Sequence, residues 1–383
     1  MFITRLLAAT LAGSTALSAA ASPAMADPAS DRFGPAHVFR WTPQPAPMPA
    51  PGSIISSAPR ALPEGLRSLA RAKQIKYATT DVRGNATFAS GLVLTPLRNK
   101  KNKTVVWAHG TTGIADRCAP SANDDVFWPE ARVAVSSLLE RGWTVAAPDY
   151  PGLGTPGPHP YLIGDSEGRS IIDSVRAARN LDDDLSREYV VDGHSQGGQG
   201  ALFANQLAGG YDGGLQLRGT VSIAPTSQTR VLAEAIPGTE GQGFMAMALY
   251  GLNAVEPSFK PETVLTGAAL GQGDALRQGC LNEVLATYAP PLKLLKGDRL
   301  PEAWVDKLAD YVDPAQTPLT APAFIVQGAD DAIVPAALTD ILVGQLKGAP
   351  VRYDTLPGRD HDSAVVDSTG RVAAWINQRF DHP

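Results

Sequence analysis

The segment Gly193-His194-Ser195-Gln196-Gly197 carries the residue types that a serine nucleophile requires. A serine at this G-x-S-x-G spacing is typical of a nucleophile elbow, in which a strand turns sharply into a helix. The flanking sequence agrees, since residues 187–191 are typical of a short strand and residues 198–207 of a helix. Such a turn exposes the serine at the positive end of a helix dipole, where negative charge can develop. We therefore expect Ser195 to be a catalytic nucleophile, with a plain structural turn as the alternative.

A serine nucleophile needs a histidine to accept its proton and a carboxylate to orient that histidine. After a nucleophile elbow, the acid precedes the histidine in the chain. Two histidines follow Ser195, namely His361 and His382. His382 is the penultimate residue, where chains commonly fray, whereas His361 lies in a loop between a predicted strand and the last helix. We predict that His361 is the base.

The acid has two candidates, Asp330 and Asp331, which both follow a predicted buried strand. We favour Asp331 because it lies three residues past Gly328, in a turn of the form G-x-x-D-x-x-V-P. The separation of 30 positions between Asp331 and His361 leaves room for one helix and one strand.

Two backbone N–H groups must bind the oxyanion that forms when the serine attacks a carbonyl carbon. One of them normally comes from the residue after the nucleophile, which is Gln196. The other is expected from the loop after the strand at 103–108, where residues 109–113 read His-Gly-Thr-Thr-Gly. We expect Thr111 to supply it, with Thr112 as the alternative.

The elements that hold these residues alternate between strand and helix. Continuous Val, Ile and Ala runs in the predicted strands indicate a buried parallel sheet. Residues 74–80 and 86–95, earlier in the chain, are predicted as an antiparallel pair of strands. The whole pattern predicts a doubly wound α/β fold with a mostly parallel sheet. The other strands are predicted at 103–108, 143–148, 187–191, 218–223, 323–327 and 351–355, and helices at 127–141, 164–180 and 198–207.

The alternation stops between Thr226 and about Thr320, where helix-like segments are interrupted by prolines. We predict that residues 226–320 form a helical cap, or lid, inserted into a core made of residues 27–225 and 321–383. Residues 244–250 are apolar on every face. This fits a helix buried against the core, a surface that faces the substrate, or both on different faces.

The first 26 residues have the pattern of a secretion signal, with Arg5 before an apolar run and a small-x-small cleavage site at Ala24-Met25-Ala26. Cleavage near Ala26 leaves an exported chain, extracellular or periplasmic, with 32 basic and 38 acidic residues and a net charge of −6. A net negative charge does not favour binding to nucleic acid. No later apolar run is long enough to predict a membrane span. No cluster of cysteines and histidines has metal-site spacing, so we expect neither a metal nor another cofactor.

The chain contains two cysteines, Cys118 and Cys280. In an exported protein a disulfide between them is the default expectation. The alternative is a pair of buried free thiols.

Several segments resemble the secretory lipase family of the α/β-hydrolase superfamily. The similarity is most specific in the loop His109–Ser121, which reads HGTTGIADRCAPS. It continues in Asp149–Gly154, His159–Leu162 and Asp173–Arg179, and then in the elbow itself. The resemblance runs from about residue 51 to the C-terminal helix.

The resemblance implies a secreted carboxyl-ester hydrolase with an α/β-hydrolase fold that acts on lipids and makes transient contact with a lipid interface. It also implies that Cys118 bridges forward to a cysteine in the lid, which Cys280 matches. The lid sequence departs from the family's pattern, which leaves the acyl-chain preference open. Three alternatives remain at this point: a short-chain esterase or peptidase, an acyltransferase with the same catalytic residues, and a binding protein without activity.

Overall fold

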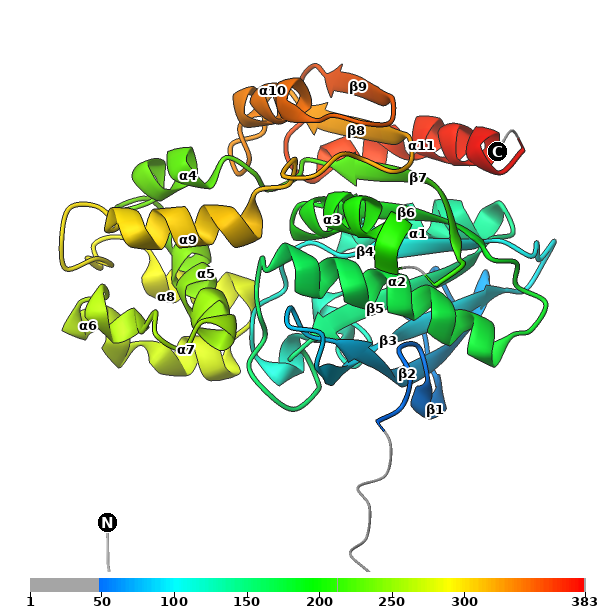
Figure 1. Ribbon diagram of the computed structural model, residues 1–383, viewed down its shortest axis with the longest axis horizontal. Helices are drawn as coiled ribbons and strands as arrows, with labels where there is room; N and C mark the ends of the chain where they lie inside the picture. The colour runs from blue at the N-terminus through cyan, green and yellow to red at the C-terminus, as the bar shows by residue number, and fades with distance from the viewer. Residues whose placement is uncertain (1–47, 212, 382–383) are drawn as a thin grey trace, which may run out of the picture. The chain divides into compact units, whose positions relative to one another are not determined.

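The computed structural model describes residues 48–211 and 213–381 of the chain. The predicted secretion signal at residues 1–26 lies outside the described residues, as does His382. The described part contains a nine-stranded sheet with the order β1-β2-β3-β5-β4-β6-β7-β8-β9 (Figure 1). Its strands are β1 (Ile54–Arg60), β2 (Ala70–Thr80), β3 (Ala86–Pro96), β4 (Thr104–Ala108), β5 (Thr144–Pro151), β6 (Glu188–His194), β7 (Gln216–Ile223), β8 (Ala323–Gly328) and β9 (Val351–Leu356).

The sheet is mostly parallel, as the sequence predicts. Strands β5, β4, β6, β7, β8 and β9 pair in parallel in that order. The first three strands pair antiparallel and join the rest of the sheet through β3 and β5. Every residue of β4 and β8 is buried, which explains the mostly apolar sequences of these two strands.

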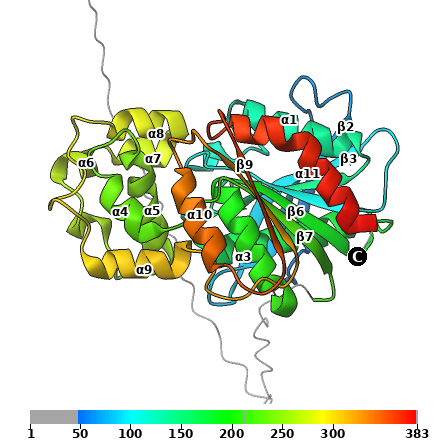
Figure 2. The same cartoon turned by 90° about the horizontal axis from the view of Figure 1, so that it is seen from above.

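Helices cover both faces of the sheet (Figures 1 and 2). On one face, α2 (Gly164–Leu181) and α3 (Gln196–Tyr211) pack over a cluster of buried side chains that includes Tyr77 and Tyr189. On the other face, α1 (Pro129–Glu140) and α11 (Ser363–Asp381) enclose a second cluster that includes Trp107, Trp143 and Phe324. Helix α10 (Ala336–Gln345) lies between β8 and β9 in the chain.

The long segment between β7 and β8 is helical and has its own apolar core, and we call its helices the cap. The cap core includes Met247, Leu249 and Tyr288. Within the described residues, no helix combines the length and apolar character needed to cross a bilayer. The cap helices are α4 (Thr229–Ala235), α5 (Gln242–Val255), α6 (Gly267–Gly271), α7 (Gly273–Gln278), α8 (Leu281–Tyr288) and α9 (Glu302–Val312).

The cap docks closely on the loop before α2. A Cβ on Gly251 of α5 would lie 2.4 Å from the carbonyl oxygen of Tyr161, so only a glycine permits this approach. Met247 and Leu249 of the same helix are buried in the cap core, whereas Phe244 and Ala248 line a cavity beside Ser195. One face of the segment 244–250 is therefore buried in the cap core, and another face lines a cavity.

Candidate active site

Ser195 occupies the turn between β6 and α3, as the nucleophile elbow requires. Its φ of +57° is a left-handed conformation, which costs a non-glycine residue roughly 1 kcal/mol or more. Backbone hydrogen bonds on both sides of the residue hold it in place. The Ser195 N–H donates to the Ile223 carbonyl at 2.8 Å, and the Ser195 carbonyl accepts from the Gln199 N–H at 3.0 Å.

The two glycines of the motif permit close packing rather than an unusual φ. A Cβ on Gly193 would lie 2.2 Å from the Gly197 carbonyl oxygen, and one on Gly197 would lie 1.9 Å from the Ala108 carbonyl oxygen. The left-handed φ falls on Ser195 itself. The glycines thus allow α3 to start directly against β4, which brings the helix N-terminus to the serine.

The strand and helix of the elbow extend further than the sequence indicates. The strand continues to His194 and the helix begins at Gln196, whereas we expected them to end at residue 191 and to begin at residue 198. Residues 192–198 are mostly polar or glycine, so they lack the apolar pattern by which a strand or helix is predicted. All of them are nevertheless buried.

His361 and Asp331 form a hydrogen-bonded pair on the loops that follow β9 and β8. Nδ1 of His361 donates to Oδ2 of Asp331 at 2.7 Å, and both residues are buried. Since the carboxylate can only accept, Nδ1 carries the hydrogen and Nε2 carries the lone pair. Asp330, the competing candidate, is exposed. As expected, one helix and one strand, α10 and β9, separate the two residues in the chain.

The loop around Asp331 fixes its carboxylate. Oδ1 accepts from the backbone N–H groups of Ile333 and Val334, both at 2.8 Å. Oδ2 also accepts from the Gln327 side-chain amide at 3.0 Å. These donors fix the orientation of the carboxylate, so that Oδ2 faces the His361 ring.

His194, next to the serine in the chain, supports the His361 loop. Its Nε2 donates to the carbonyl oxygen of His361 at 3.1 Å, and the two rings lie 4.5 Å apart between centroids. Burial lowers the pKa of His194 well below its usual value, so this ring is neutral. The sequence assigned no role to His194, because its contact with residue 361 is not local.

The predicted oxyanion loop packs directly against Ser195. A Cβ on Gly110 would lie 3.4 Å from the Ser195 Cβ. Two side chains hold the next residue, Thr111. The Trp128 indole N–H donates to the Thr111 carbonyl at 3.2 Å, and the Tyr161 hydroxyl contacts the Thr111 hydroxyl at 2.7 Å. Gln196 opens α3, and the first N–H groups of a helix have no intrahelical acceptor.

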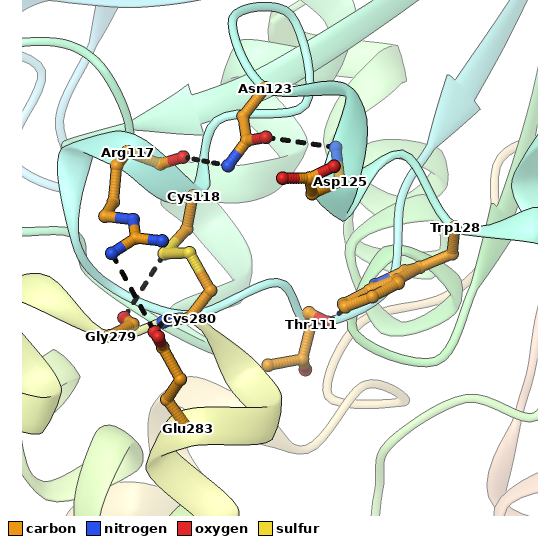
Figure 3. Close-up of a disulfide and its surroundings, with 9 residues drawn as sticks. All are labelled: Thr111, Arg117, Cys118, Asn123, Asp125, Trp128, Gly279, Cys280 and Glu283. Carbon is orange, nitrogen blue, oxygen red and sulfur yellow. Dashed lines mark hydrogen bonds and ion pairs between the residues drawn. A yellow bond between two sulfur atoms is a disulfide. The ribbon is translucent and has the colours of Figure 1, made fainter. Parts of the chain in front are cut away.

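A disulfide between Cys118 and Cys280 joins the core to the cap beside this loop (Figure 3). The predicted disulfide is therefore present, and the alternative of two free thiols is wrong. A backbone hydrogen bond lies next to it, in which the Leu281 N–H donates to the Thr112 carbonyl at 2.8 Å. The cap is therefore attached to the segment that follows β4 both covalently, at Cys118, and through the backbone, at Thr112.

Two cavities meet at Ser195. The first lies beneath the cap and has a volume of about 90 Å³. It is mostly apolar, and its walls include Leu162, Leu232, Ala233, Ile236, Phe244, Met245, Ala248 and Leu308. The second is larger, about 640 Å³, and contains His361 together with several carboxylates. Thr111 and Ser195 line both cavities.

Comparison with known proteins assigns the chain to a family. The family model described as secretory lipase matches residues 130–383. The chain belongs to the secretory lipase family. This member is therefore a carboxylic-ester hydrolase, and the resemblance seen in its motifs is confirmed.

Relatives of this family member match most of its length. A secreted triacylglycerol lipase, LIP7, from Malassezia globosa is 26% identical and aligns over 87% of the chain and 76% of its own length. LIP4, another secreted triacylglycerol lipase of that organism, is 29% identical over 82% of the chain and 73% of its own length.

Solved structures agree on the α/β-hydrolase fold. Candida antarctica lipase A in its closed state superposes with a TM-score of 0.74 at 22% identity, covering 87% of the chain and 83% of that protein. The rice cell wall degrading esterase LipA from Xanthomonas oryzae superposes with a TM-score of 0.69 at 18% identity, covering 87% of the chain and 99% of that protein.

A buried glutamate in α2 of this secretory lipase supports Gln196. Oε1 of Glu167 accepts from the Gln196 side-chain amide at 2.8 Å and from the Leu162 N–H at 3.0 Å. The same amide lies 3.3 Å from Nε2 of His159. Sequence analysis missed Glu167, although it lies four residues before Ile171 on the apolar face of the helix, which is an unusual place for a carboxylate.

Replacement of Glu167 with glutamine should change how stability depends on pH. Burial raises the pKa of Glu167 to about 8, whereas an unfolded chain keeps it near roughly 4.3. Between these values folding takes up a proton, so the contribution of Glu167 to the free energy of unfolding falls as the pH rises. Glu167→Gln keeps the Oε1 acceptor and does not titrate.

We therefore expect the stability of Glu167→Gln relative to the unaltered protein to increase from pH 5 to pH 8, as measured by urea denaturation. Glu140→Gln, an exposed change at the end of α1, is the control and should show no such trend. A difference that stays constant across this range contradicts a protonated, buried Glu167.

Among the described residues, one group of three side chains could hold a metal ion. Glu130 of α1, His194 of β6 and Asp362 of the loop before α11 each offer a ligand atom, and these atoms lie within 4.8 Å of one another. They line the larger cavity. Local spacing could not reveal this group, because its members lie far apart in the sequence.

Proposed function

We propose that this family member is an exported serine hydrolase that cleaves fatty-acyl esters, including acylglycerols, through an acyl-enzyme on Ser195. The observation that carries the proposal is the place of Ser195, between an apolar cavity and a second cavity lined by His361, whose Nδ1 is hydrogen-bonded to the Asp331 carboxylate. Its export is supported by the signal-like residues 1–26 and by relatives named as secreted.

In the first step, Nε2 of His361 accepts the hydroxyl proton of Ser195 while Oγ attacks the ester carbonyl carbon. Asp331 keeps the ring in the tautomer whose Nε2 lone pair is available. The carbonyl oxygen becomes negative and is held by the N–H groups of Thr111 and Gln196. When the C–O bond breaks, His361 returns the proton to the departing alcohol.

The second step reverses the roles. His361 removes a proton from water as the water oxygen attacks the acyl carbon. The same two N–H groups hold the second oxyanion. Collapse of this intermediate releases the carboxylic acid, and the proton on His361 returns to Ser195.

The apolar cavity is the proposed site of the acyl chain. It extends from Ser195 between α4, α5 and α9, and its apolar walls favour a hydrocarbon over a polar group.

A short-chain esterase is the second candidate, and the size of the apolar cavity favours it. Its volume of about 90 Å³ is well below the roughly 300 Å³ at the lower end of ligand pockets. An acyl chain of more than a few carbons must therefore displace side chains of α4 or α5.

Hydrolysis of p-nitrophenyl esters from acetate to palmitate, together with emulsified triglyceride, tests the proposal. The mature protein should hydrolyse them, with Ser195→Ala protein as the blank. Preference for long chains and turnover of the emulsion support a lipase. Preference for acetate or butyrate identifies a short-chain esterase, and equal rates for the two proteins contradict the role of Ser195.

Enlargement of Ala248 should shorten the preferred acyl chain. This residue lines the apolar cavity from α5, so Ala248→Phe places a ring where the acyl chain binds. We expect kcat/KM for the palmitate ester to fall about tenfold or more relative to acetate. Ala235→Phe, on the exposed side of α4, is the matched control and should leave the ratio unchanged. Equal ratios for the two variants place the acyl chain elsewhere.

A further inference from the structure

The cavity on the His361 side of Ser195 is strongly acidic. Among the described residues that line it, four carry carboxylates and none is lysine or arginine. The four are Glu130, Asp360, Asp362 and Asp367. A cavity lined by one sign of charge concentrates ligands of the opposite sign.

Two of these carboxylates already have a partner within the protein. Asp367 forms an ion pair with Arg359, and Asp360 accepts from the backbone N–H of Ser363. The other two, Glu130 and Asp362, have no ion pair with lysine or arginine among the described residues. Neither carboxylate is therefore neutralised by an ion pair, although Glu130 accepts a hydrogen bond from its own backbone N–H and is influenced by the charge of Arg132 on the same helix.

Glu130 is the more unusual of the two, because it is 8% exposed and still lines the cavity. A carboxylate is rarely buried without a cationic partner. Its ligand atom lies within 4.8 Å of those of Asp362 and His194. Trp128, two residues earlier, also lines the cavity, and an indole ring attracts organic cations through its π face.

We propose that this cavity binds the alcohol part of the ester and selects alcohols that carry an ammonium group. The inference rests on the proposed function, because His361 must return its proton to the departing alcohol, which places that alcohol on the His361 side. Carboxylates beside an aromatic ring are the chemistry that recognises an ammonium group, above all a quaternary one. The same charges repel alcohols that carry phosphate.

The test compares butyrylcholine with its neutral isostere 3,3-dimethylbutyl butyrate near pH 8, with EDTA present to keep metal ions from the carboxylates. We expect kcat/KM of the unaltered protein to be about tenfold higher for the cationic ester than for the neutral one. A factor of this size is reasonable for a charge pair in a partly solvated site. The double variant Glu130→Gln, Asp362→Asn should bring this ratio close to one. Asp362→Asn alone, at the exposed carboxylate, should lower it in part.

Glu140→Gln is the matched control. It removes one charge from the same helix, ten residues or about 15 Å from Glu130, and should retain the ratio. The neutral ester reports whether each variant is folded and active. A ratio near one in the unaltered protein, or one that the double variant leaves unchanged, overturns the inference.

Binding without turnover separates this inference from the proposed function. Calorimetry with Ser195→Ala protein should show that choline binds about tenfold more tightly than 3,3-dimethylbutanol. If this preference is present but no ester is hydrolysed by the unaltered protein, the proposed function fails and the ammonium site stands. If esters are hydrolysed but choline has no advantage in calorimetry or in kcat/KM, only the ammonium site fails.

Discussion

Replacement of Ser195 by alanine should lower kcat for ester hydrolysis by about 10⁴-fold to 10⁶-fold, which is the range for loss of a serine nucleophile. No acyl-enzyme can form without Oγ, so only the oxyanion loop and the binding cavities remain to accelerate attack by water. The measurement is the steady-state rate on p-nitrophenyl butyrate, with a sample pure enough to exclude contaminating esterases. Trapping of the acyl-enzyme by mass spectrometry should succeed with the unaltered protein and fail with the variant.

Ser227 provides the matched control for this experiment. Its hydroxyl is buried and has no hydrogen-bond partner among the described residues, so Ser227→Ala should retain activity within about threefold. Ser195→Ala should unfold at the same urea concentration as the unaltered protein or a higher one, since alanine lacks the buried hydroxyl. A Ser195→Ala protein that is folded and still active would contradict the proposed mechanism.

Loss of the disulfide should produce the largest change in stability. The bond between Cys118 and Cys280 closes a loop of 162 residues. In the chain-entropy description, such a cross-link contributes on the order of 5 kcal/mol to the free energy of unfolding, because it restricts the unfolded chain. We therefore expect the double variant Cys118→Ser, Cys280→Ser to lose about this amount in urea denaturation. That loss is comparable to the whole stability of many domains.

Dithiothreitol supplies an independent comparison. The reduced protein should match the double variant in stability, whereas the reductant should leave the double variant itself unchanged. Both should also lose activity before they lose the sheet, because Cys280 precedes the residue whose N–H binds the Thr112 carbonyl beside Ser195. A double variant as stable as the unaltered protein contradicts the entropic contribution of this bond.

The sequence predicts the parallel part of the fold well, and the reason is physical. The strands β4 and β8 are buried on both faces, so each appears in the sequence as a short, mostly apolar run, which is typical of a parallel strand. The elbow is also a local signal, because a strand, a turn and a helix follow each other directly in the chain, from Glu188 to Tyr211. The order of the nucleophile, acid and histidine then limits the candidates for the acid and the base to a few residues.

What the sequence does not predict depends on contacts between distant segments. Glu167 supports Gln196 from a different helix, and Trp128 holds Thr111 from across 17 positions. Glu130 and Asp362 lie more than 200 positions apart, yet they line one cavity. The local sequence around these residues does not indicate which distant residues they contact. Their roles therefore become visible only in the folded structure.

The attachment of the cap has a mechanical consequence. The cap leaves the core after β7 and returns at β8, which are neighbouring strands, and a body held at two points can rotate about the line that joins them. The disulfide adds a third point at the loop that follows β4, on the other side of β6. In the oxidised protein, any opening of the cap must therefore leave the segment around Cys280 next to the loop that follows β4. Entry of a substrate then depends on movement of the parts of the cap that are farther from this bond.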